Sequence, residues 1–286
     1  MPEDDHASLY KQLAIECSFD PCVQSLVTGD MVLSDANPWI ETAFPPAFIP
    51  MYSKAAGNMI GYWKHWNCSR SPTIVNFSGI TNLGEPQIAY ELATSFNQLK
   101  YVYFMNLLFA TGLKIDEEIQ ADAEELAFDD FDALLAVCRK HGQRKSGLLD
   151  LEVFRENPPH ACFKASPMSY PGSFPNPYSK KKQLTEACSY EIHSWFQEDE
   201  YEFRKRIANE WLVPKWLRVE EQRPVFDQML NSGNITGAWM SLNSIGWNLE
   251  DAHQAIRELE PHIDDPRFSI LTRAWRAIPR EGQDYY

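Results

Sequence analysis

The chain has 286 residues, which is about two domains by the usual prior of roughly 150 residues each. Hydrophobic residues make up 44% and aromatic residues 13%, so the composition excludes a disordered chain and allows a substantial core. The 40 acidic against 26 basic residues give a net charge of −14, which argues against broad electrostatic binding to nucleic acid or to anionic membranes. No stretch approaches the roughly eighteen uninterrupted apolar residues of a membrane span, and the acidic start lacks the order of a signal peptide. We therefore expect a cytoplasmic protein.

From about Pro38 to Leu92, short segments rich in Ile, Val, Tyr and Trp alternate with turns that contain Gly, Pro and Asn. This pattern predicts a small mixed or antiparallel sheet. Thr94 or Ser95 then caps a predicted helix that runs to about Phe109. The predicted strands cover residues 48–52, 59–66, 73–77 and 86–92.

The next stretch reads as helix, with apolar positions near Ile115 and a second pattern that starts at Phe131. The second pattern ends at Gly142 after three basic residues, as the end of a helix prefers. The spacing allows either one long helix or two helices separated near Phe128. The segment 114–141 is thus a helical part of the N-terminal half.

An acidic run lies within this segment: between Asp116 and Asp132 there are nine acidic residues and no basic one. On one continuous helix, steps of four and three would place five of these carboxylates on one face. They are Glu118, Asp122, Glu125, Asp129 and Asp132. Because like charges at this spacing repel, the stripe does not stabilise the helix. It is either a solvated face or a docking surface for a basic partner.

Six of the nineteen prolines fall between residues 157 and 178, where helix cannot persist. We expect a linker, or a long loop that wraps the first domain, over residues 157–182. Helical patterns follow, including one through Cys188, Ile192 and Trp195 and another capped by Asn248. The expected fold is therefore α+β, with an α+β domain over 1–156 and an all-helical domain over 183–286.

The sequence shows little that is typical of catalysis or of metal binding. The six cysteines form no CxxC pair and are expected to be free thiols, although an even number also allows disulfides. The seven histidines have no spacing that places two ligands on one face, and there is no phosphate-binding glycine loop or nucleophile elbow. We expect no enzyme, no metal and no cofactor; the alternative is an enzyme whose site assembles from dispersed residues.

The segment from Phe44 to about Leu108 resembles the SUKH superfamily, which includes many bacterial immunity proteins and yeast cell-wall regulators. The resemblance covers about 65 of the 286 residues, and the helical half after Leu184 has no counterpart in it. The matching motifs are Phe44-Pro45-Pro46, Phe48-Ile49-Pro50-Met51, Gly57-Asn58 before the aromatic strand, Pro72-Thr73-Ile74-Val75, Gly84-Glu85, Ile88–Tyr90 and Ala93–Leu99.

This resemblance implies a domain without catalysis that binds a toxin and blocks it, often a nuclease delivered by contact-dependent or type VI secretion. An acidic surface suits the basic cleft of a nuclease independently of the resemblance. In this hypothesis the acidic stripe steers the encounter. Tyr62, Trp63 and Trp66 are expected to be exposed and to supply an anchor that the partner buries; the alternative, for two of the three, is packing in the core. Alternation along the strand places Tyr62 and Trp66 on one face and Trp63 on the other. The predicted function is thus a cytoplasmic immunity protein that neutralises a cognate toxin; the alternative is a regulatory adaptor without a toxin partner.

Overall fold

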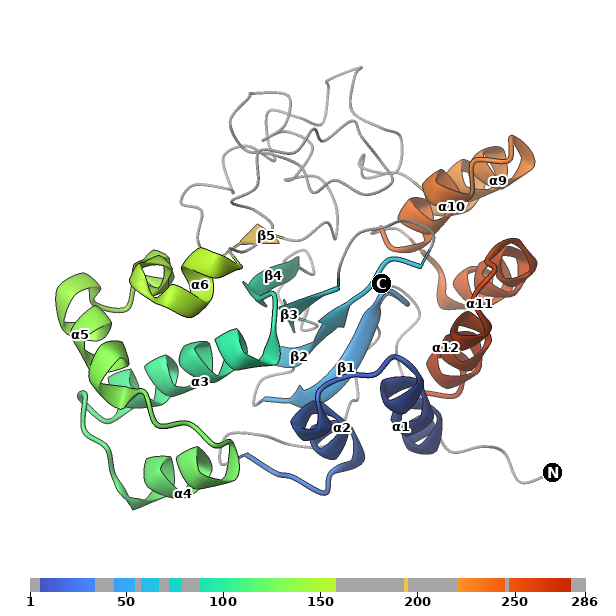
Figure 1. Cartoon of the computed structure of the whole chain (residues 1–286). Coiled ribbons are helices and arrows are strands. Elements are labelled where there is room, and N and C mark those ends of the chain that lie inside the picture. The colour runs from blue at the N-terminus through green and yellow to red at the C-terminus, as the bar shows by residue number, and fades with distance from the viewer. Residues whose placement is uncertain are drawn as a thin grey trace, which may run out of the picture.

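The structure is a computed structural model, and it describes residues 6–33, 44–54, 58–66, 72–78, 88–157, 193–194, 221–244 and 247–278. These parts form a small sheet with helices on both sides (Figure 1). The expected α+β class is confirmed, with an antiparallel sheet and flanking helices in the N-terminal half and helices in the C-terminal half.

Neighbouring strands along the chain are neighbours in the sheet, and the first four are antiparallel. The strands are β1 (Phe48–Ser53), β2 (Asn58–Trp63), β3 (Thr73–Ser78), β4 (Ile88–Ala93) and β5 (His193–Ser194). All four predicted strands are confirmed, although the second ends at Trp63 rather than at Trp66.

The short strand β5 pairs in parallel with β4, so the helix predicted in this region is wrong at His193 and Ser194. The other residues of that predicted helix lie outside the described residues. His193 lies opposite Tyr90, and Ser194 lies opposite Glu91. The open edge of β4 offers backbone donors and acceptors to this segment. Apolar spacing within the segment gives no sign of such an edge.

Phe48 and Gly61 show how closely the centre of the sheet is packed. A Cβ atom at Gly61 would lie 2.3 Å from the Ile49 carbonyl oxygen and 2.7 Å from the Phe48 ring. Phe48 also meets Phe77 with ring centroids 5.4 Å apart. Glycine is therefore required at position 61, because any side chain would displace the aromatic core above it.

Helices of the N-terminal half surround the sheet. They are α1 (His6–Glu16), α2 (Pro21–Thr28), α3 (Phe96–Ala110), α4 (Glu117–Glu125), α5 (Phe131–His141), the 3₁₀ helix η2 (Lys145–Asp150) and α6 (Glu152–Glu156). The hydroxyl of Ser95 accepts a hydrogen bond from the Gln98 amide, which confirms the predicted cap of α3. The acidic segment forms two helices rather than one, because the chain turns between α4 and α5 at Ala127, whose φ is 48°.

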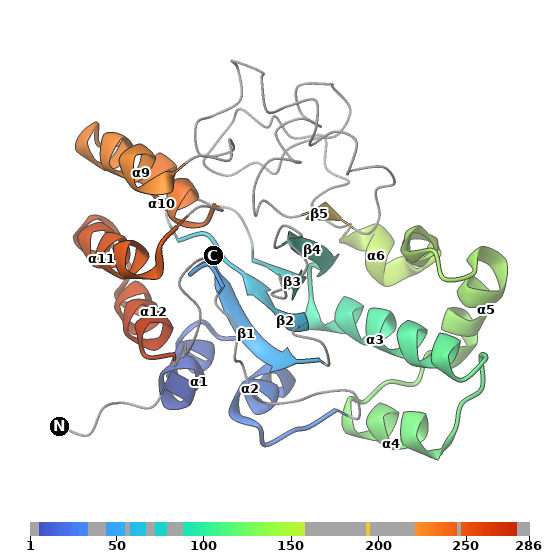
Figure 2. The same cartoon turned by 180° about the vertical axis from the view of Figure 1, so that it is seen from behind.

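The C-terminal helices are α9 (Gln222–Asn231), α10 (Ile235–Leu242), α11 (Leu249–Leu259), the 3₁₀ helix η5 (Glu260–His262) and α12 (Pro266–Arg276). The Asn248 side chain accepts from the amides of Glu250 and Asp251, so the predicted cap of α11 is confirmed. Figures 1 and 2 show α9–α12 on one side of the sheet and α3–α6 on the other.

The two halves share one hydrophobic core. Helix α1 packs against α12, and the Trp66 ring meets Phe268 of α12 at 5.8 Å between centroids. Three buried hydrogen bonds join residues more than 170 positions apart: Ala47 N to Asn243 Oδ1 (2.6 Å), Trp239 Nε1 to His65 Nδ1 (3.0 Å) and Trp275 Nε1 to the Phe44 carbonyl (2.8 Å). The C-terminal helices thus complete the core of the N-terminal half. The predicted linker lies, apart from Asn157, outside the described residues.

Candidate functional site

Helix α4 presents a charged surface because its sequence has few apolar residues on which to pack. Asp116 caps the helix, and its carboxylate accepts a hydrogen bond of 2.9 Å from the Ile119 amide. Ile119 and Ala123 are buried and hold the helix on the core. The remaining side chains of α4 are exposed, apart from Asp122.

An open depression of about 560 Å³ lies along one side of α4. We call it the α4 groove; its lining residues are Ile115, Asp116, Glu117, Gln120, Ala121 and Glu124. Ile115 is 41% exposed, and only two other large hydrophobic side chains in the described parts of the chain are exposed. The groove therefore combines three carboxylates with an apolar contact point.

The predicted stripe does not line this groove. Glu118 and Glu125 are exposed on α4 but lie outside it. Asp122 is only 6% exposed and accepts a hydrogen bond from the Tyr103 hydroxyl of α3. The prediction that Asp122 belongs to the surface is therefore wrong, because a buried phenol from another helix holds its carboxylate inside.

The stripe is also divided between two helices. Asp129 lies in the turn after α4, and Asp132 lies in the first turn of α5, so neither continues a face of α4. Between them, Asp130 accepts a hydrogen bond of 2.7 Å from the Tyr101 hydroxyl. Burial and this carboxylate raise the pKa of Tyr101. Asp129 and Asp132 remain exposed acids, but the continuous face that would align them does not form.

The three predicted anchor residues lie in the core. Tyr62 and Trp66 are each 8% exposed, and Trp63 is 1% exposed. The Tyr62 ring stacks on Phe19 with centroids 4.3 Å apart, and burial raises the pKa of Tyr62 to about 12. Side chains along β2 point alternately to the two faces of the sheet, and both faces are covered. Neither face therefore exposes an aromatic side chain of this strand. The prediction that these three side chains form an exposed anchor is therefore wrong, because all three pack in the core.

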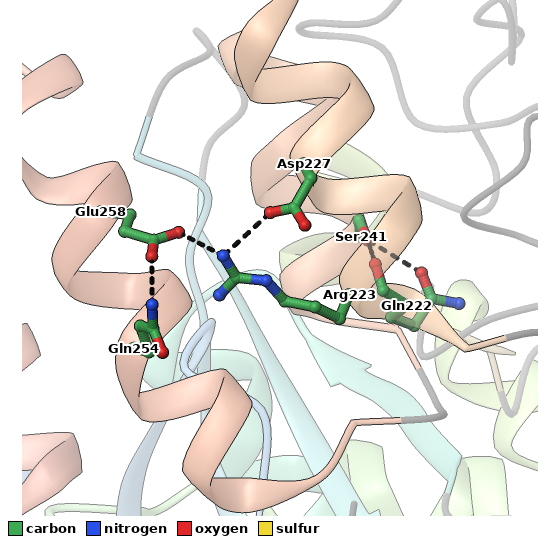
Figure 3. A network of polar contacts seen from close by, with 6 residues as sticks. All are labelled: Gln222, Arg223, Asp227, Ser241, Gln254 and Glu258. Carbon is green, nitrogen blue, oxygen red and sulfur yellow. Dashed lines mark hydrogen bonds and ion pairs between the residues drawn. The ribbon is translucent and has the colours of Figure 1, made fainter.

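A second polar cluster joins the C-terminal helices (Figure 3). The Arg223 guanidinium of α9 contacts Asp227 at 2.9 Å and Glu258 of α11 at 2.7 Å. Gln254 donates to the same Glu258 carboxylate at 2.7 Å. Beside them, the buried Ser241 hydroxyl donates to the backbone and side-chain oxygens of Gln222, as Figure 3 also shows. Because its carboxylates already contact Arg223, this cluster holds helices together rather than presenting free charge.

Within the described ranges, no group of three His, Cys, Asp or Glu side chains is arranged to hold a metal ion. None of the helices described by the structure is long and apolar enough to cross a membrane. No family model, curated protein or solved structure matches the chain.

The sequence identified the acidic run but not the part of it that forms a groove. Asp116, Glu117 and Glu124 belong to the run, yet the spacing rule selected a different face of α4. Ile115 was read only as a helix position. The signal in the sequence that points to this groove is an apolar residue, Ile115, directly before the acidic helix cap Asp116.

Proposed function

We propose that this protein is a non-catalytic binding protein that holds a basic protein partner in the α4 groove. The observation that carries the proposal is the combination of three carboxylates with the exposed Ile115 in one depression. Charge complementarity selects the partner, because a basic surface gains from a groove that contains acids and no base.

The groove has the composition of a small protein-binding surface. Apolar contacts at the centre of an interface contribute most of the affinity when polar groups around them exclude water. Ile115 and Ala121 supply the apolar part, and Asp116, Glu117 and Glu124 supply the polar surroundings. The net charge of −14 adds long-range attraction for the same kind of partner.

The narrower proposal is that the partner is a toxin, in particular a nuclease, and that binding neutralises it. Two features support this proposal: the resemblance to immunity proteins, and the basic clefts with which nucleases bind their substrates. The adaptor alternative differs only in the partner. It is favoured if the protein bound in the groove is basic but harmless.

The first test is a co-expression pull-down of the full-length chain with the protein encoded by the adjacent gene. The proposal expects a basic partner at about one copy per chain, whose toxicity is suppressed and whose binding weakens at high salt. Failure to recover a basic protein, or binding that does not respond to salt, contradicts the proposal.

Two matched double variants then test the groove itself. Glu117→Lys with Glu124→Lys reverses two charges inside it, and Glu118→Lys with Glu125→Lys makes the same change on the same helix outside it. We expect the first pair to slow association at low salt by about tenfold and the second pair to slow it much less. Equal effects of the two pairs would contradict the assignment to the groove.

A further inference from the structure

A second pocket, separate from the α4 groove, lies where α3 meets the segment between α5 and η2. Its volume is about 280 Å³, and it is lined by Asn106 and Phe109 of α3 together with Gln143 and Lys145. This volume is close to the lower end of the range for ligand sites, about 300 Å³, so a small molecule fits it. No residue of this pocket also lines the α4 groove.

The amine of Lys145 is held in place within this pocket. Its Nζ donates a hydrogen bond to Asn106 Oδ1, which fixes the end of a long side chain. The backbone of η2 packs closely on the end of α5, because a Cβ atom at Gly147 would lie 2.6 Å from the Cβ of His141. At the far end of η2, the Asp150 carboxylate lies 2.7 Å from the side chains of both Lys140 and His141. The segment that carries Lys145 therefore packs against both α3 and α5.

Burial, and then the positive charge of Lys54, lower the pKa of Lys145 from 10.5 to about 8. The Cys138 thiol of α5 acts in the opposite direction. Each pKa unit is a factor of ten, so the neutral amine is on the order of a hundredfold more populated at pH 7 than in an ordinary lysine. The neutral amine is the form that attacks carbonyl carbon.

The surroundings of this amine define the kind of molecule that it meets. Lys54 brings a second ammonium group close enough to act on Lys145, and its Nζ lies 5.7 Å from the centre of the Tyr103 ring. Asn106 and Gln143 offer amide donors and acceptors, and Phe109 offers an apolar wall. An anionic group is attracted by the ammonium group of Lys54, whereas a carbonyl carbon reacts with the amine of Lys145.

We propose that this pocket binds a small aldehyde or ketone that carries an anionic group, and that Lys145 forms an imine with its carbonyl. The Nζ lone pair attacks the carbonyl carbon, and the carbonyl oxygen takes up a proton as the amine loses one. The resulting carbinolamine loses water, and a C=N bond replaces the C=O bond. The step consumes no oxidant and no reductant.

The test uses the full-length protein with pyridoxal 5′-phosphate, which carries both an aldehyde and a phosphate. Borohydride reduction fixes any imine, and mass spectrometry of the digested protein locates it. The proposal expects a saturable adduct on Lys145 that is lost in Lys145→Arg. It expects the adduct to persist in the matched variant Lys114→Arg, which removes an exposed lysine that does not line the pocket. Labelling spread over the exposed lysines, with no excess on Lys145, would overturn the proposal.

Two further measurements on the wild-type protein do not depend on any variant. Labelling of Lys145 should rise with a midpoint near pH 8, as the pKa requires. Pyridoxal, which lacks the phosphate, should label it about tenfold more slowly, because it loses the electrostatic attraction of the nearby Lys54 ammonium. A midpoint near that of ordinary lysines would contradict the reactive amine, and equal rates for the two aldehydes would contradict the anionic ligand.

Discussion

Replacing Asn243 by alanine tests whether the sheet and the C-terminal helices unfold as one unit. The Asn243 side chain follows α10 and makes two hydrogen bonds inside the core. Its Oδ1 accepts from the Ala47 amide at 2.6 Å, and its Nδ2 donates to the Trp239 carbonyl at 2.8 Å. The first of these bonds reaches across 196 residues and joins the two halves of the chain.

The structure sets the size of the expected effect. Ala47 is fully buried, so its amide loses its acceptor without access to water, which costs about 1–3 kcal/mol. The Trp239 carbonyl keeps a second donor, the Asn243 amide at 3.2 Å, so losing the side-chain bond adds only about 1 kcal/mol. We therefore expect Asn243→Ala to lower the free energy of unfolding by about 2–4 kcal/mol.

Urea unfolding, followed by tryptophan fluorescence and by far-ultraviolet circular dichroism, measures this loss. Both signals should shift together, because the halves share a core. The control is Asn231→Ala at the exposed end of α9, which should change stability by less than about 0.5 kcal/mol. A loss below that value for Asn243→Ala, or two separate transitions of which only one shifts, would refute the reasoning.

Two further predictions concern buried and exposed carboxylates. Asp122→Ala should cost about 1–3 kcal/mol in urea unfolding, because the buried Tyr103 hydroxyl loses this acceptor. Asp122→Asn should cost less because it keeps an acceptor oxygen, and equal costs would contradict the hydrogen-bond explanation. Hydrogen bonds from Lys140 and His141 lower the pKa of Asp150 from 3.8 to about 2, so this carboxylate stabilises the fold above about pH 4 and ceases to do so as the pH falls through 2. The midpoint temperature of thermal unfolding should accordingly fall less steeply between pH 5 and pH 2 in Asp150→Asn than in the wild type. If the midpoint temperatures of the two proteins fall in parallel, the contacts of Asp150 with Lys140 and His141 contribute nothing to stability.

Local signals in the sequence predicted the elements well. The cap at Ser95, the helix end at Gly142 and the cap at Asn248 are each read from a few neighbouring residues, and each is confirmed. Alternation with turn residues placed the strands for the same reason. In these cases the residues that determine the element lie within one turn of helix or one strand of each other. Local sequence is therefore enough to predict the element.

The candidate site depended on contacts between distant segments, and there the sequence was insufficient. Spacing placed Asp122 among the surface acids, but its environment is set by Tyr103, which lies 19 residues earlier on another helix. Alternation assigned Tyr62 to one face of a strand without showing that Phe19 covers that face. Lys145 drew no attention because nothing in its neighbours along the chain shows that it is buried beside Asn106.

The hydrogen bond between Phe44 and Trp275 has a consequence for how the protein is made. Its two partners are 231 residues apart, and Trp275 belongs to the helix that packs on α1. At about 5–20 residues per second, synthesis needs on the order of 10–50 s to supply Trp275 after Phe44 has been added. During that interval the core around β1 and α1 lacks its C-terminal cover. The nascent chain therefore exposes apolar surface to chaperones until the helix that contains Trp275 has been translated.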